Sequence, residues 1–394
     1  MVRPITLGHL GISPKGREYV NDALDNNRLS RGKYTETFER EFARLHQSKH
    51  GIFMNSGTSA LQVALAALKE VHGYQDGDEV LVPATTFIAT SNIVLQNNLK
   101  PVFVDVHPLT YNMDPEKVQE KITSRTRAII PVHLFGLPAD MRSIQNIASD
   151  NDLQVIEDSC ETMFAQTNGR SVGSFGHLSC FSTYVAHLVV GGVGGLVLTD
   201  DDKLAEICKS LMAHGRDSIY TSIDDDNNVG SGLQNIIERR YKFDRLGYSY
   251  RATELEAAIA LSELERWEEN ITRRRQNAAY LTSLLRDEDN ILQLPFIPEN
   301  YTHSFMMYPM VLSPHLDRDK LLLLLEERGI ETRHLFPLLS QPIYEKLFPG
   351  EAEKYPVAQR LAKHGFFIGC HQGLTKEDLD YVSEVFHEYN PVYR

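Results

Sequence analysis

The chain has 394 residues, of which 42% are hydrophobic and 24% are charged, and its formal net charge is −13. These are ordinary values for a globular protein of two domains, so they exclude a disordered or fibrous chain. The acidic balance, without a dense basic patch, argues against a nucleic-acid partner. No run of eighteen apolar residues occurs and the first residues lack a signal-peptide core, so we expect no membrane partner and a cytoplasmic protein.

The cysteine and acidic residues give no pattern of a metal site. The four cysteines lie far apart, at positions 160, 180, 208 and 370. Their spacing argues against a disulfide framework, a zinc finger or an iron–sulfur cluster. The acidic segment 224–228 is better interpreted as a solvated loop than as a calcium site, because its oxygens lack the spacing of a calcium loop. We therefore expect no metal.

Short apolar runs alternate with helical patterns through the first two-thirds of the chain. Helical spacing covers residues 35–45, and an alanine- and leucine-rich helix is predicted over 60–69. Apolar runs typical of strands lie at 51–54, 79–82, 101–105, 127–132, 154–158 and 196–199. Because these runs are continuous rather than alternating, the strands should be covered on both faces. The sequence predicts an α/β domain with a mostly parallel sheet.

The pattern changes in the last third of the chain. Residues 253–285 predict one or two long helices, whose Arg273-Arg274-Arg275 run is interpreted as a solvated helix face. A strand over 306–312 and a helix over 318–328 then predict a smaller α+β domain. We expect a large α/β domain over residues 1–250 and a small α+β C-terminal domain over residues 251–394.

A serine- and threonine-rich turn opens the helix predicted over 60–69. Ser56 and Thr58 offer hydroxyls there, and Gly57 permits close approach of a ligand. Unpaired backbone N–H groups and the helix dipole at such a position favour an anion. A Ser/Thr helix cap would produce the same residues, so this turn alone does not establish a site.

Two further segments offer polar groups for such a site. Asp158 ends the strand predicted over 154–158, at the sheet edge where α/β proteins bind ligands, although capping of the following turn explains it equally well. Ser182 would add another hydroxyl to an anion site. The glycine-rich segment 191–195 precedes a strand instead of opening a helix, so a tight turn is the better interpretation.

The order and separation of these segments resemble the DegT/DnrJ/EryC1/StrS family of nucleotide-sugar aminotransferases, over about residue 29 to the end. The markers are the segments 55–61, 82–90, 155–158, 172–176 and 246–258, with Arg333 and Phe336-Pro337. The resemblance implies a type I pyridoxal-phosphate (PLP) aminotransferase fold, with a large mostly parallel α/β domain, a smaller α+β domain and a homodimer.

Carried onto matching positions, the resemblance implies a role for each residue. The cofactor phosphate would be held by Ser56, Gly57, Thr58 and Ser182. Phe87 would stack on the pyridine ring, and Asp158 would pair with its protonated nitrogen so that the ring accepts electrons. The family often contributes an asparagine from the partner subunit to the phosphate. This chain has Ser249 there, which can still donate one hydrogen bond.

His187 stands where the family has its Schiff-base lysine, five residues after Ser182. No lysine lies between Ser182 and Asp202, so the cofactor would bind non-covalently. A histidine can still transfer protons near neutral pH. The alternative is a site that lost its lysine, by natural degeneration or by engineering.

Inside the family, a histidine at this position is similar to the 4-keto-6-deoxy-sugar 3-dehydratases, and Glu161 and the segment 367–372 also resemble them. The resemblance implies pyridoxamine phosphate (PMP) as the working cofactor and a nucleotide-linked 4-keto sugar as substrate. His187 would remove a proton from the cofactor methylene, and the neighbouring sugar hydroxyl would leave. L-glutamate would regenerate the amine, since the iron–sulfur branch needs closely spaced cysteines that this chain lacks.

The segment 333–338 instead looks like the aminotransferases. Two alternatives therefore stay open beside the dehydratase. One is a nucleotide-sugar aminotransferase whose lysine was replaced, and the other is a sugar- or cofactor-binding homologue without turnover.

Overall fold

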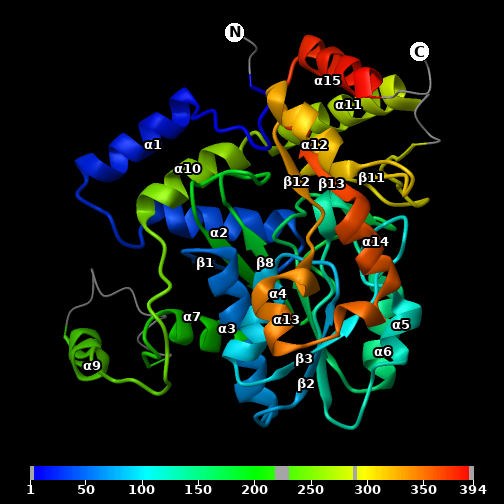
Figure 1. Cartoon of the computed structure of the whole chain (residues 1–394). Helices are drawn as coiled ribbons and strands as arrows, with labels where there is room; N and C mark the ends of the chain where they lie inside the picture. The colour runs from blue at the N-terminus through cyan, green and yellow to red at the C-terminus, as the bar shows by residue number, and fades with distance from the viewer. Residues whose placement is uncertain (1–3, 218–229, 287–290, 390–394) are drawn as a thin grey trace.

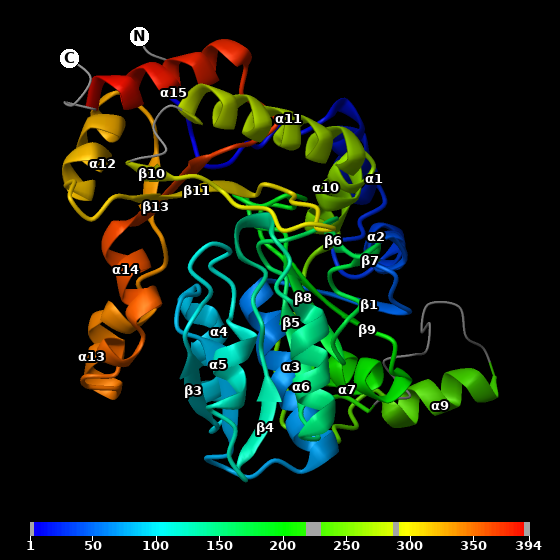
Figure 2. The ribbon, with the colours of Figure 1, turned by 90° about the vertical axis from the view of Figure 1, so that its right-hand side faces the viewer.

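The computed structural model describes residues 4–217, 230–286 and 291–389, so the acidic segment 224–228 lies outside the described residues. The first two-thirds of the chain surround a seven-stranded sheet, and much of the last third surrounds a four-stranded sheet (Figures 1 and 2). The boundary near residue 250 stays a prediction.

The large sheet has the strand order β1-β9-β8-β5-β4-β2-β3. Its strands are β1 (His50–Met54), β2 (Glu79–Pro83), β3 (Lys100–Val104), β4 (Thr126–Ile129), β5 (Gln154–Asp158), β8 (Leu178–Ser182) and β9 (Gly195–Thr199). Only β9 runs antiparallel to its neighbours, so the predicted mostly parallel sheet is confirmed. All six predicted strands are present. Strand β8 was not predicted, since two serines interrupt its apolar run.

Helices cover both faces of this sheet (Figure 2). They include α2 (Lys33–Leu45), α3 (Gly57–His72), α4 (Ile88–Gln96), α5 (Pro115–Gln119), α6 (Met141–Asp150) and α7 (Asp202–Met212). Helix α9 (Ser231–Arg239) lies away from the sheet (Figures 1 and 2). Helix α3 is alanine- and leucine-rich because it lies buried between the sheet and its neighbours α4 and α7. A short hairpin, β6 (Gln166–Thr167) with β7 (Arg170–Ser171), follows β5.

Helix α1 (Pro14–Asp25) was not predicted from the sequence. Two start signals mark it: the Ser13 side chain accepts from the Gly16 amide, and Pro14 occupies the first turn. It packs on α10 (Glu254–Leu264), which begins at a capping box formed by Thr253 and Glu256.

The smaller sheet is antiparallel, with the order β10-β11-β13-β12. Its strands are β10 (Leu292–Gln293), β11 (Met307–Leu312), β12 (Thr332–His334) and β13 (Gly365–Gly369). The accompanying helices are α11 (Trp267–Leu285), α12 (Arg318–Glu327), α13 (Pro342–Leu347), α14 (Pro356–His364) and α15 (Lys376–Tyr389). None of the helices in the described ranges has the length and apolar composition needed to cross a membrane.

One prediction about α11 is wrong. Arg273 is exposed, but Arg274 is fully buried, with 0% of its surface exposed. The physical reason is helical spacing: residues 274, 278 and 281 lie at i, i+4 and i+7, so Arg274 shares the inward face of Ala278 and Leu281. The prediction of a solvated face had relied on the charge of Arg274 and had not considered its position on the helix.

Candidate active site

The N-terminus of α3 lies at the carboxyl edge of the large sheet. Ser56 is the helix cap, and its Oγ accepts a hydrogen bond from the Ser59 amide at 3.0 Å. The amides of Gly57 and Thr58 have no hydrogen-bond partner in the described part of the chain. Free amides and the positive end of the helix dipole make this turn suitable for a phosphate.

Gly57 brings three segments into contact. A Cβ atom at this position would lie 2.8 Å from the Sγ of Cys160 and 2.9 Å from the Cβ of Ser182. Only glycine fits there without displacing a neighbour. The structure therefore places Ser182, at the end of β8, directly beside the α3 turn, as the phosphate assignment requires.

Asp158 ends β5 and is buried. Its Oδ2 accepts from the Thr90 hydroxyl at 2.8 Å and its Oδ1 accepts from the Cys160 amide at 3.2 Å. Burial raises the pKa of Asp158. No Lys, Arg or His nitrogen of the described residues lies within salt-bridge distance of this carboxylate. A cationic ligand atom such as a protonated pyridine nitrogen would supply the missing counter-charge.

Thr90 belongs to a hydrogen-bond chain that was not predicted. Its Oγ1 lies 2.8 Å from the Thr86 Oγ1, one helical turn away, and 2.8 Å from the Asp158 carboxylate. All three side chains are buried. The chain fixes the orientation of the carboxylate, and the only sequence signal was a pair of threonines four residues apart.

Replacement of Thr90 by valine, which keeps its shape, is expected to lower cofactor affinity or turnover by roughly 10-fold. A hydrogen bond to a charged group contributes about 1.5–3 kcal/mol, and 1.4 kcal/mol is a factor of ten. Cofactor titration and steady-state rates measure the effect. Thr86→Val is the matched control, since it removes a hydroxyl one step farther from Asp158, and an equal loss in both variants would contradict the assignment.

Phe87 precedes α4 and 56% of its surface is exposed. Its ring meets Phe336 edge-on at 6.2 Å, and Phe336 stacks on Phe135 at 5.3 Å. An exposed aromatic ring beside a buried aromatic row can cover a planar ligand.

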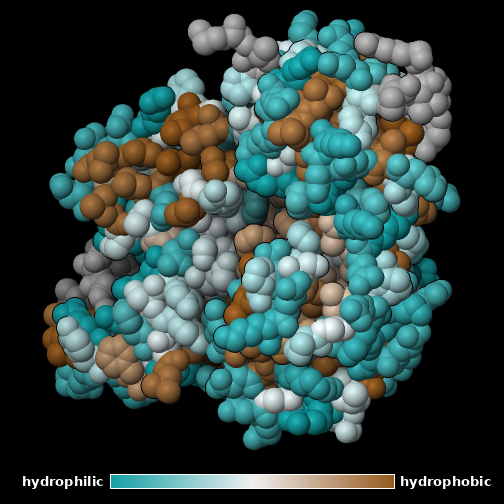
Figure 3. All heavy atoms as spheres, in the orientation of Figure 1, coloured by the Kyte–Doolittle hydropathy of each residue, from teal (hydrophilic) through white to brown (hydrophobic). Residues whose placement is uncertain are grey.

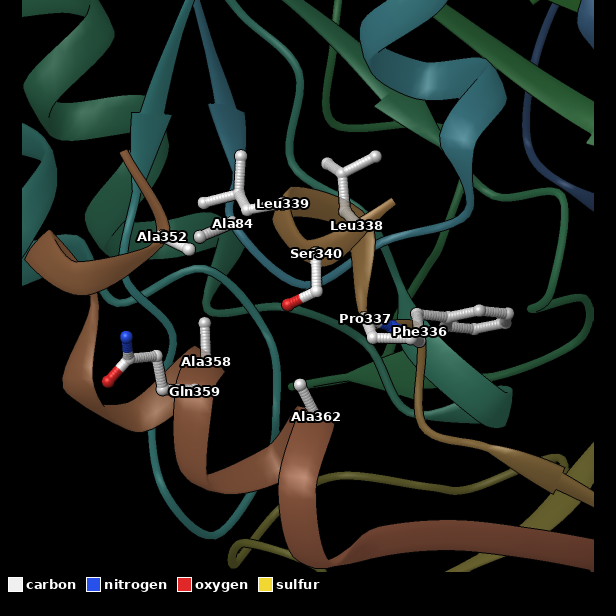
Figure 4. A pocket seen from close by; sticks show the side chains of 10 residues that line it. All are labelled: Ala84, Phe336, Pro337, Leu338, Leu339, Ser340, Ala352, Ala358, Gln359 and Ala362. Atoms are coloured by element: carbon white, nitrogen blue, oxygen red, sulfur yellow. The ribbon is translucent and has the colours of Figure 1, made fainter. Parts of the chain in front are cut away.

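Phe336 also lines a small pocket (Figure 4). It is lined by Ala84, Phe336, Pro337, Leu338, Leu339, Ser340, Ala352, Ala358, Gln359 and Ala362. None of these side chains is ionisable, so we assign no chemistry to this pocket.

Glu161 is buried three residues after Asp158, and its Oε2 accepts from the Phe135 amide at 3.0 Å. Burial raises its pKa to about 8, and the nearby charge of Asp158 acts in the same direction. At neutral pH the carboxyl is therefore mostly protonated and can donate a hydrogen bond from its O–H.

His187 lies in the segment that follows β8. Its Nδ1 lies 3.2 Å from the carbonyl oxygen of Ser182, which identifies Nδ1 as the protonated nitrogen of the neutral ring. Burial is the main cause that lowers the pKa of His187 to about 4, and the positive charge of Arg274 contributes in the same direction. The Nε2 lone pair has no partner in the described part of the chain. This is the arrangement of a neutral base that stays active across the neutral range.

Ser249 is exposed. Its Oγ accepts from Arg251 at 3.0 Å, and the neighbouring Tyr250 carbonyl accepts from the Asn55 amide at 2.8 Å. Ser249 is thus beside the strand that leads into α3, but no hydrogen bond joins it to Gly57 or Ser182 within the described residues.

The fold and the site together define the class of protein. A mostly parallel sheet brings together a helix N-terminus with free amides, an exposed aromatic ring, a buried carboxylate and an imidazole with a free Nε2, and these groups fit a PLP-type cofactor. The chain belongs to the DegT/DnrJ/EryC1/StrS aminotransferase family, whose model matches residues 12–387. This is a family of PLP-dependent enzymes of nucleotide-sugar metabolism.

Relatives carry two reactions. The chain is 32% identical to a GDP-perosamine synthase of Escherichia coli O157:H7, over 96% of each chain. Its structure is similar to E. coli GDP-4-keto-6-deoxy-D-mannose-3-dehydratase with bound hydrated PLP, with a TM-score of 0.88, 28% identity and coverage of 98% and 99%. It is also similar to the structure of a GDP-4-keto-6-deoxymannose-3-dehydratase with a trapped PLP-glutamate geminal diamine. For this pair the TM-score is 0.86 and the sequence identity 27%, and the match covers 97% of this chain and 99% of the other.

Proposed function

We propose that the protein is a PMP/PLP-dependent 3-dehydratase that removes the C-3 hydroxyl of a nucleotide-linked 4-keto-6-deoxy sugar. The observation that carries the proposal is the neutral imidazole of His187 with a free Nε2, at the position where a lysine amine would hold the cofactor covalently. A base that cannot form a Schiff base supports proton transfer with a free cofactor.

In this proposal, separate groups of residues bind the cofactor and transfer the proton. The α3 turn with Ser56, Gly57 and Thr58, together with Ser182, binds the phosphate, and Phe87 covers the ring. Bound PMP or PLP supplies the amine chemistry and an electron-accepting ring. Asp158 keeps the ring nitrogen protonated, while His187 holds or moves a proton at Nε2.

Glutamate balances the reaction. The sugar exchanges its C-3 hydroxyl for hydrogen, and glutamate becomes 2-oxoglutarate and ammonia, so that oxygen, nitrogen and hydrogen are conserved. The sugar is reduced by two electrons and glutamate is oxidised by two. The relative that holds a PLP-glutamate geminal diamine supports L-glutamate as the donor.

A sugar aminotransferase is the second candidate, because the chain is also similar in sequence to a GDP-perosamine synthase. The sequence of the segment 333–338 also resembles the aminotransferases, and its Arg333 is exposed on β12 and pairs with Glu331 at 2.6 Å. Without a lysine, such an enzyme would need another group to return protons to the cofactor.

We also propose a homodimer. Apolar atoms gather over α1 on the face shown in Figure 3, where Leu24 and the flanking Leu10 and Leu29 are exposed. Leu246, 98% exposed, lies three residues from the exposed Ser249. A second copy that covers these leucines would bring Ser249 towards the partner's phosphate site.

The half-reaction with glutamate tests the proposal without a choice of sugar. Purified protein, PLP and L-glutamate are mixed, and the cofactor spectrum and 2-oxoglutarate are followed. We expect conversion to PMP well above the rate of free PLP with glutamate. A bound cofactor with an unchanged spectrum would contradict the glutamate-dependent mechanism and favour a binding protein without turnover.

Deprotonation of Glu161 is expected to limit activity at alkaline pH. Its pKa of about 8 lies above the ordinary carboxyl value, so the O–H is present below pH 8 and is lost above it. We expect wild-type turnover to fall as the pH rises through 8. Glu161→Gln, a neutral donor at every pH, should keep pH 7 activity within a few-fold and lack this limb.

A pH–rate profile of both proteins measures the difference. An alkaline limb of equal position in wild type and Glu161→Gln would contradict the role of Glu161. Loss of activity in the variant at every pH would show that the ionised carboxylate is the active form.

A further inference from the structure

Arg274 on α11 is an arginine enclosed by the protein, with neutral hydrogen-bond acceptors. Its Nε donates to the Gln372 side-chain oxygen at 3.0 Å. One terminal nitrogen donates to the carbonyls of Phe305 and Met306 at 3.1 and 2.9 Å, and the other reaches the carbonyl of His187 at 3.4 Å. A single side chain thus connects segments around the smaller sheet to the segment that carries the proposed base.

No carboxylate of the described residues lies within salt-bridge distance of this guanidinium. Burial lowers the pKa of Arg274 to about 10, so the side chain remains positively charged at neutral pH. A buried charge is normally paired, because its removal from water costs several kcal/mol. Carbonyl dipoles compensate only part of that cost. Because burial of an unpaired cation is costly, the presence of Arg274 at this position suggests a functional role.

The segment that carries His187 is held on a second side by the N-terminal residues. A Cβ atom at Gly8 would lie 2.7 Å from the Cα of Ala186 and 2.9 Å from the carbonyl oxygen of Val185, so the two backbones are in close contact. Between this contact and the Arg274 fork, the backbone around His187 has little freedom to move.

We propose that Arg274 is a positioning residue for His187: its guanidinium fixes the carbonyl of His187 and places a permanent positive charge beside the imidazole. This rests on the proposed role of His187 as the base. The charge disfavours an imidazolium in its vicinity, so Nε2 keeps a free lone pair, and the hydrogen bond aims the ring.

The ionisable groups on the elements around His187 are compatible with this role. They are Tyr184, His9, His371, Glu331 and Arg274 itself. The Tyr184 ring lies 6.0 Å from the His187 ring, edge-on, and Glu331 is engaged by the Leu7 amide. Arg274 is the member of this set that is both permanently charged and bonded to the His187 backbone.

The test compares Arg274→Gln with Arg275→Gln. Arg275 is the next residue of α11 and also donates to backbone carbonyls, those of His303 and Phe164, but it makes no hydrogen bond to His187. Ring-labelled histidine NMR of the protein without cofactor follows the titration of His187, assigned with a His187→Asn protein. We expect the His187 midpoint to move upward in Arg274→Gln and to stay unchanged in Arg275→Gln. An unchanged midpoint in both variants would overturn the electrostatic role.

Arg274→Lys separates charge from geometry. Lysine keeps the positive charge and loses the fork, so the midpoint of His187 should stay low while the glutamate half-reaction slows at least 10-fold. A wild-type rate in Arg274→Lys would overturn the positioning role, and this arm decides if Arg274→Gln does not fold. The NMR midpoint needs no sugar and no cofactor. Failure of the sugar reaction and failure of this inference are therefore distinguishable.

Discussion

Replacement of Asp158 by asparagine is expected to lower turnover by on the order of 10²–10³-fold, with little change in the free energy of unfolding. Loss of one preorganised electrostatic group typically has this effect on the rate. The buried side chain keeps its size and can keep its hydrogen bonds to Thr90 and Cys160, but it no longer holds a proton on the ring nitrogen. Steady-state rates and denaturant unfolding measure both quantities.

Asp105→Asn is the matched control for this prediction. Asp105 follows β3 at the same sheet edge, and its carboxylate accepts from the amides of Val357 and Ala358 at the start of α14. Its loss should weaken the cap of α14, and hence stability, more than the chemistry of the ring. Turnover of Asp158→Asn near the wild-type rate would contradict the whole assignment of the site.

Replacement of His187 by asparagine is expected to lower turnover by about 10²–10⁴-fold, the usual contribution of a positioned acid–base group. Cofactor affinity should change little, because the phosphate and ring contacts come from other residues. Turnover and the cofactor dissociation constant are both measured on the same preparations of wild type and variant. His9→Asn, which removes an imidazole from the neighbouring N-terminal segment, should leave both nearly unchanged.

His187→Lys adds a second arm to the same prediction. A lysine at this position supplies an amine, so the cofactor should become covalently attached and reducible with borohydride. The sugar product should then shift towards an amino sugar. Turnover of His187→Asn within about 10-fold of wild type would show that another group transfers the proton.

Much of the fold could be predicted because its signals are local. Continuous apolar runs marked six strands of the large sheet, and a breaker-free run marked α3. Strand β8 and helix α1 were missed for opposite reasons. In β8, serines interrupt the apolar run that would indicate a strand. In α1, the Ser13-Pro14 start signal is present but lies in a polar segment.

The site was accessible to motif comparison but its electrostatics were not. Gly57 and Ser182 meet because distant strands end at one edge, which a parallel sheet implies. The raised pKa of Glu161 comes from its burial in the folded chain and from the charge of Asp158, while the hydrogen bond from the Phe135 amide acts in the opposite direction. Thr90 looks like any helical threonine, and Arg274 like a surface charge. Both gain a role only from partners far away in the chain.

The proposed function is removal of the C-3 hydroxyl from the sugar. The most direct measurement loads the protein with PMP, adds GDP-4-keto-6-deoxymannose and L-glutamate, and identifies the sugar product by mass spectrometry and NMR at C-3 and C-4. We expect a sugar that has lost one oxygen, with hydrogens at C-3 and the C-4 ketone retained. A product with nitrogen at C-4 and the C-3 hydroxyl in place would contradict it and establish an aminotransferase.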